Sequence, residues 1–128
     1  MPRTAEEILE FNDVMELVAK NAASEPGRER VLALQPKTDI EPVLIELRRV
    51  GEMVELLESG AHPPLGAIYE FTDALKVASV AGSLLSAETL VKMTSTLATA
   101  RLMKRFLENR AREAPLLADM SQVMGTFE

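Results

Sequence analysis

The chain has 128 residues, of which 20 are acidic and 14 are basic, so its formal net charge is −6. This length suits one domain with a core, and because only 4% of the residues are aromatic, aliphatic side chains must supply most of it. The absence of cysteine excludes disulfide bonds, thiolate metal sites and a cysteine nucleophile, and the acidic balance disfavours general binding to a phosphate backbone.

The first part of the chain predicts two helices. A capping-box pattern at Thr4 and Glu7 is followed by apolar residues at spacings of three and four, which predicts a helix over residues 5–22. A short helix is then predicted over residues 25–35, with Ser24 as its N-cap, Pro26 in its first turn and Pro36 at its end.

A third helix is predicted over residues 39–59, with Asp39 as its N-cap and Gly60 at its end. Its apolar residues recur at spacings of 3, 4, 3, 4 and 3. We call this set the apolar seam; its members are Ile40, Val43, Leu47, Val50, Val54 and Leu57. We expect the seam to be core that faces the first and fifth helices, and the alternative is pairing across a dimer, because a coiled coil uses the same spacing.

The second half predicts a loop and three more helices. Residues 60–66 contain two glycines and two prolines, and a fourth helix follows from Ile68 to its end at Gly82. Ser86 caps a fifth helix of about 40 Å that meets no glycine or proline until Pro115, where a short last helix begins. No segment alternates like a strand. We therefore expect one all-α domain over residues 1–128, an irregular bundle of about five to six helices including two long ones.

Residues with catalytic chemistry do not form a convincing constellation. His62 has no second histidine to share a metal site with, and no glycine-rich phosphate loop is present. The acidic residues of the first helix have the spacing of a solvated face; they are Glu6, Glu7, Glu10, Asp13 and Glu16. We predict no catalytic residue, no metal site and no bound cofactor in this chain.

Four basic residues of the predicted fifth helix form the one candidate binding site. We call them the basic stripe: Arg101, Lys104, Arg105 and Arg112 fall within an arc of about 100° at helical spacing. The simpler interpretation is a solvated face near a helix C-terminus, where positive charge is favoured. The functional interpretation is contact with nucleic-acid phosphates or with an acidic surface of a partner.

Several short motifs, in the same order along the chain, resemble the MutS family. Gly27-Arg28, Pro36 and Asp39 are similar to the start of its core domain. Further matches narrow the resemblance to the second bacterial MutS paralogue, the branch with a C-terminal Smr-type nuclease domain and no mismatch-reading domain. These matches are Leu9-Glu10-Phe11, Ala23-Ser24-Glu25, Pro64-Leu65-Gly66-Ala67-Ile68, Gly82-Ser83-Leu84-Leu85 and Lys104-Arg105-Phe106-Leu107. Ala67 departs from the pattern, because the family tends to have a second glycine there.

The resemblance implies that the chain is an N-terminal core-domain fragment of a longer, cytoplasmic protein. Such a parent resembles an ATP- and Mg-binding clamp with an endonuclease domain, acting on DNA or ribosomes in repair, recombination control or ribosome rescue. Its expected partners are the remainder of the parent chain, DNA or rRNA through the parent, and a second parent copy, with no membrane involved. The last residues, Phe127-Glu128, carry no C-cap, as expected of a fragment.

Three hypotheses follow for this chain. The first is a non-catalytic structural module that supports the core and lever helices, which couple ATP-driven motion to the clamp. The second is direct contact with nucleic acid through the basic stripe. The third is a helical adaptor that dimerises through the apolar seam.

Overall fold

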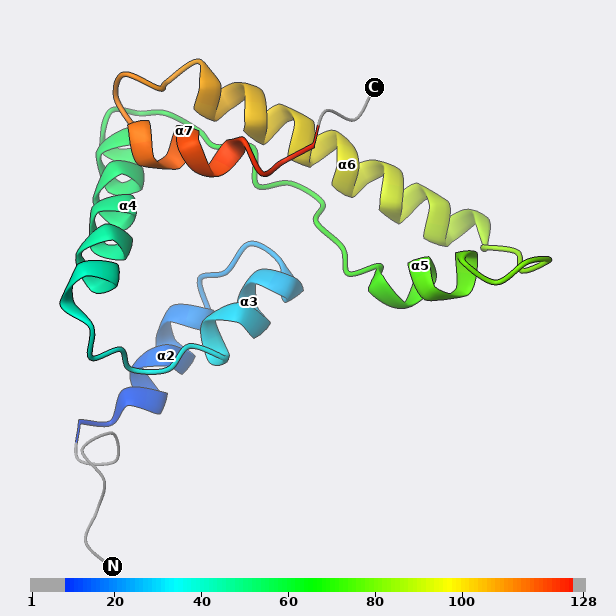
Figure 1. Cartoon of the computed structure of the whole chain (residues 1–128), viewed down its shortest axis with the longest axis horizontal. Helices are drawn as coiled ribbons and strands as arrows, with labels where there is room; N and C mark the ends of the chain where they lie inside the picture. The colour runs from blue at the N-terminus through cyan, green and yellow to red at the C-terminus, as the bar shows by residue number, and fades with distance from the viewer. Residues whose placement is uncertain (1–8, 126–128) are drawn as a thin grey trace, which may run out of the picture.

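The structure is a computed structural model that describes residues 9–125. Within that range it contains six α-helices and no strand, which confirms the predicted all-α class. The helices are α2 (Phe11–Ala19), α3 (Glu25–Leu32), α4 (Ile40–Glu58), α5 (Thr72–Ala78), α6 (Ala87–Glu108) and α7 (Pro115–Ser121). Helix α2 packs on α3, while α7 packs on both long helices, α4 and α6 (Figure 1).

The largest buried cluster lies where α4, α6 and α7 meet. It contains Leu56 of α4, Leu107 of α6, Leu117 of α7 and Ala114 just before α7. Four partly buried residues pack against it: Met53, Met103, Ala61 and Phe106. The core is therefore aliphatic, as the composition predicts, and it is small for a chain of this length.

Glu52 of α4 joins two helices that are far apart in the sequence. Its carboxylate accepts hydrogen bonds from the backbone N–H groups of Leu116 at 3.1 Å and Leu117 at 2.9 Å. The residue before α7, Ala114, has no side chain that can cap the helix, and Pro115 has no N–H to satisfy. A carboxylate at this end also meets the positive end of the helix dipole. Glu52 therefore serves as the cap of α7 from another helix.

The end of α4 has the geometry of a Schellman motif. Gly60 has a positive φ of 84°, its N–H donates to the carbonyl of Leu57, and the N–H of Ala61 donates to the carbonyl of Leu56. Ala61 then packs on the core cluster. The motif thus ends α4 and turns the chain towards α6.

The predicted helix boundaries are correct at some places and wrong at others. Ser24 caps α3, accepting a hydrogen bond from the N–H of Gly27 at 3.2 Å, as predicted. Asp39 occupies the N-cap position of α4, but its side chain makes no capping bond. Helix α3 ends at Leu32, so Leu34 lies beyond it although the predicted helix extended to residue 35.

The prediction of a first helix over residues 5–22 is wrong in the described part. Helix α2 begins only at Phe11, because Glu10 has a left-handed backbone with φ 52°, through which a right-handed helix does not continue. It ends at Ala19. The capping-box residues Thr4 and Glu7, and the chain end at Phe127 and Glu128, lie outside the described residues.

The fourth helix is also shorter than predicted. Ile68 and Phe71 precede α5, and the extended segment before it follows α6, where the N–H of Tyr69 donates to the hydroxyl of Thr96 at 2.9 Å. Phe71 occupies the N-cap position of α5 with a non-helical φ of −140°, so the helix begins only at Thr72. Gly82 has the positive φ expected of a terminating glycine, four residues after α5 ends.

The predicted burial of the apolar seam is wrong. Five of its six residues are exposed, and Val43 is half-buried. The face of α4 that is buried instead carries Met53 and Leu56, because Glu52 and the core cluster bring α7 to that side. The spacing identified the helix correctly but did not identify which face the described residues cover.

Removing the Glu52 cap should destabilise the chain. We expect Glu52→Ala to lower the free energy of unfolding by about 1.5–3 kcal/mol, because two N–H groups lose a charged acceptor. Glu55→Ala is the matched control, since Glu55 is exposed on the same helix, and its effect should stay within about 0.5 kcal/mol. Urea unfolding measures the free energy of unfolding of the two variants. Equal losses in Glu52→Ala and Glu55→Ala would contradict the capping role of Glu52.

Replacing Gly51 of α4 and Gly60 at its C-terminal end by alanine should change the stability of the fold in opposite directions. Gly60→Ala should cost about 1–2 kcal/mol, because alanine is strained at positive φ. Gly51→Ala should add about 0.5–1 kcal/mol of stability, because Gly51 is inside the helix and a Cβ there meets nothing within 4 Å. Thermal unfolding that shifts both variants in the same direction would refute this account of the helix end.

Candidate nucleic-acid interface

Helix α6 carries three of the four residues of the basic stripe. Ser86 caps the helix as predicted, its hydroxyl accepting a hydrogen bond from the N–H of Thr89 at 3.1 Å. Arg101, Lys104 and Arg105 lie on one side of its last turns, as their spacing of three and four requires. Both arginines belong to exposed residues. Three members of the basic stripe therefore lie on α6, before the helix ends at Glu108.

Lys104 has a structural contact. It is half-buried, and its Nζ donates a hydrogen bond to the backbone carbonyl of Met124 at 2.9 Å. This bond fastens the segment that follows α7 to α6. To reach a phosphate, Lys104 would have to exchange this carbonyl for the ligand, so it contributes less to an anion site than its charge suggests.

The placement of Arg112 on α6 is wrong. The helix ends at Glu108, and residues 109–113 form turns, so Arg112 is exposed but does not share the helical arc. Arg110 stabilises this end: its guanidinium carbon lies 4.0 Å from the centre of the Phe106 ring, and it donates to the carbonyl of Phe106 at 3.3 Å. The structure thus has Arg101, Lys104 and Arg105 on α6 and Arg112 in the turns that follow it.

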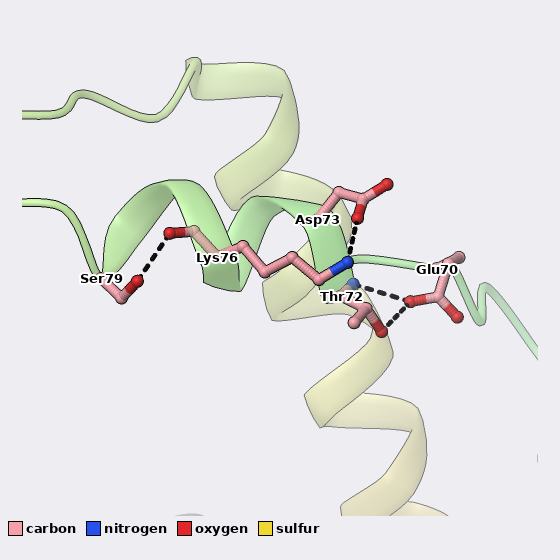
Figure 2. A network of polar contacts seen from close by, with 5 residues as sticks. All are labelled: Glu70, Thr72, Asp73, Lys76 and Ser79. Atoms are coloured by element: carbon pink, nitrogen blue, oxygen red, sulfur yellow. Dashed lines mark hydrogen bonds and ion pairs between the residues drawn. The ribbon is translucent and has the colours of Figure 1, made fainter.

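A second polar group lies at the start of α5 and was not singled out from the sequence. Glu70 accepts hydrogen bonds from the N–H of Thr72 at 2.7 Å and from the Thr72 hydroxyl, while Lys76 pairs with Asp73 at 2.8 Å (Figure 2). The Thr72 hydroxyl, followed by its N–H, lowers the pKa of Glu70 from its ordinary value of 4.5. This group is exposed and caps a short helix, so its role is local.

The remaining candidate residues stay apart. His62 is exposed in the segment after α4, and Glu10, Asp13 and Glu16 are exposed along α2, while Glu6 and Glu7 lie outside the described residues. Among residues 9–125, no three His, Asp or Glu side chains are close enough to hold a metal ion. No helix in that range is both long and apolar enough to cross a membrane.

The apolar seam, which was expected from the sequence to be core, is exposed instead. The described part of the chain is all-α, with two long helices and a small core. The seam and other exposed leucines and valines leave apolar helix faces open. Helices with apolar residues on more than one face are typical of elements inside a larger protein. The fold and surface therefore define a class: an all-α segment with open apolar surface.

The comparison with known proteins shows that the chain is similar to one segment of much longer proteins. The chain is 30% identical over 125 residues to endonuclease MutS2 of Bacillus cytotoxicus, 31% identical over 125 residues to that of Bacillus mycoides, and 34% identical over 119 residues to that of Symbiobacterium thermophilum. These matches cover 93–94% of the chain but only 15–16% of the relatives. The chain is thus a homologue of one segment of endonuclease MutS2, which confirms the resemblance to the second MutS paralogue. No protein-family model and no solved structure matches it.

The lowered pKa of Glu70 predicts an acid-sensitive start of α5. Because the folded pKa lies below 4.5, the interaction stabilises the fold at pH values above 4.5 and is lost as the pH falls through the folded pKa. Carbon-detected NMR titration should show this pKa rising in Thr72→Val, which removes the hydroxyl, and unchanged in Thr72→Ser, which keeps it. A Glu70 pKa that Thr72→Val leaves unaltered would show that the hydroxyl is not the main cause.

Proposed function

We propose that the chain is a non-catalytic structural module of a MutS2-type protein. In this role it supports the core and lever helices that pass ATP-driven motion to a clamp on DNA or on ribosomes. The observation that carries the proposal is the match of 93–94% of the chain to about a sixth of the relatives' length. The relatives are named endonucleases, and their catalytic parts would lie in the segments that this chain does not match.

The architecture supports a mechanical role. Helix α4 has 19 residues and α6 has 22, so they are about 28 Å and 33 Å long. Their C-terminal parts are joined through α7 by the core cluster and by Glu52. Two long helices fixed at one corner transmit displacement as stiff elements, whereas loops of the same length would absorb it.

The second candidate is direct contact with nucleic acid, and one observation favours it. Arg101 and Arg105 are exposed one helical turn apart on α6. Against it stand the contact of Lys104 with Met124 and the separate position of Arg112, which reduce the number of phosphates that the predicted stripe could neutralise together. This candidate needs only the chain itself, so it can be tested without the parent protein.

One set of assays on the 128-residue chain distinguishes the two candidates. For a structural module we expect no ATP hydrolysis, no DNA cleavage and no salt-sensitive binding to duplex DNA, branched DNA or ribosomes at low salt. Turnover of ATP above background would sink the proposal. Binding that weakens steeply with salt and is lost in Arg105→Glu, but not in the control Arg28→Glu on α3, would establish the second candidate instead.

A further inference from the structure

Helix α4 has two apolar faces that point in different directions. At about 100° per residue, Val54 of the apolar seam and Leu56 of the core cluster are separated by roughly 160° around the helix. Leu56 is only 2% exposed, because it packs with α6 and α7. Leu47 and Val50 of the seam are 61% and 60% exposed. The described residues therefore cover one apolar face of α4 and leave the other open.

The open face is long and continuous. From Ile40 to Leu57 it extends about 26 Å along the helix. Leu44 widens it, since this residue is also exposed and lies next to Ile40 and Leu47 at helical spacing. A stripe of this length and width corresponds to the contact surface of another helix rather than to scattered surface leucines.

An apolar groove extends the seam towards α2. The groove has a volume of about 530 Å³ and lies between Phe11 and Met15 of α2, the connection formed by residues 34–37, and α4. Three seam residues, Val43, Leu47 and Val50, line it. The seam and the groove are therefore one surface, which a single helix laid along α4 would cover together.

The charges beside the seam define what can bind there. Of the glutamates of α4, Glu46 and Glu58 lie beside the seam, one on each side, and Glu46 is paired with Arg49 at 3.2 Å. Glu41, Arg48 and Glu55 lie about 130° from the middle of the seam. Lys37 and Glu46 both line the groove. A helix with lysine or arginine beside its apolar stripe would complement this border. A second copy of α4 would place two acidic borders together, which disfavours a homodimer.

We propose that the seam and the groove form the docking surface for an amphipathic helix with basic flanks, supplied by the rest of a MutS2-type chain. The match covers only 16% of each relative, so most of the relatives' sequence lies outside it and can contain such a helix. The inference rests on the proposed function and specifies it: the helix docked on α4 is the element that the module supports. Its contact holds α4 against a second stiff element.

The test uses the 128-residue chain and labelled peptides of about 30 residues that tile the Bacillus mycoides MutS2 relative outside its matched segment. Fluorescence anisotropy should detect binding of at least one peptide that has apolar residues at helical spacing with flanking lysine or arginine. The affinity should fall about tenfold in Val50→Gln, because a buried methyl pair is replaced by an unpaired amide. Added salt should weaken it further, because the borders are charged.

The matched control is Val91→Gln on α6. Val91 is also a helical valine, and it is 64% exposed, so the same substitution there should change the affinity by less than about twofold. Both variants should keep the circular dichroism of the original chain, since neither side chain belongs to the core. Absence of any binding peptide, or equal losses in the two variants, would overturn the proposal.

Light scattering tests the alternative occupant of the seam, which is a second copy of this chain. The proposal expects a monomer at the concentrations of the binding assay. A dimer that Val50→Gln dissociates and Val91→Gln does not would assign the seam to a second copy and overturn the proposal. These outcomes differ from failure of the proposed function, which ATP turnover by the chain would reveal.

Discussion

The structure depends on one carboxylate between two helices. Glu52 accepts from two N–H groups at the start of α7, a helix that has no cap of its own and begins with proline. Because these bonds fix where α7 begins relative to α4, they bring Leu117 against Leu56, and Leu107 of α6 completes the same cluster. Helix α7, which packs on both long helices, is thus held by an electrostatic contact as well as by apolar burial. Without Glu52, the core cluster alone would hold α7 against α4 and α6, and the start of α7 would lose its cap.

The small core follows from this arrangement. In the described residues only six hydrophobic side chains are buried, and many leucines and valines of α2, α4 and α6 remain exposed. Apolar burial is the main source of stability in folded proteins, so a segment that buries so little by itself has apolar surface left for contact with other segments. The homology is independent support, because the chain matches only about a sixth of much longer proteins. The open surface and the short match length both support the proposal that the chain is a module of a longer MutS2-type protein.

Sequence reasoning identified local features well and relations between helices poorly. Ser24, Ser86 and Gly60 act as predicted, because caps and terminating glycines depend on residues within four positions. The face of α4 that is buried was predicted wrongly, because helical spacing shows which residues share a face but not which partner covers it. No local pattern marks Glu52 as a cap, since its partners are 64 and 65 residues away in the sequence. Arg112 was placed on a helix because no glycine or proline interrupts residues 87–114, yet α6 ends in successive turns after Glu108.

The same limit applies to the candidate site. Three of its four positively charged side chains do lie together on α6, as their spacing predicted, but charge and spacing could not reveal that Lys104 is bound to the carbonyl of Met124. That bond changes what the stripe can do, because a lysine that fastens the chain after α7 must break a structural contact before it can hold a phosphate. The apolar seam presents the opposite case: its spacing was clear, and its exposure gives it a role that burial would have removed. Because the open face of α4 is apolar and has glutamates beside it, a helix that docks there needs an apolar stripe flanked by lysine or arginine.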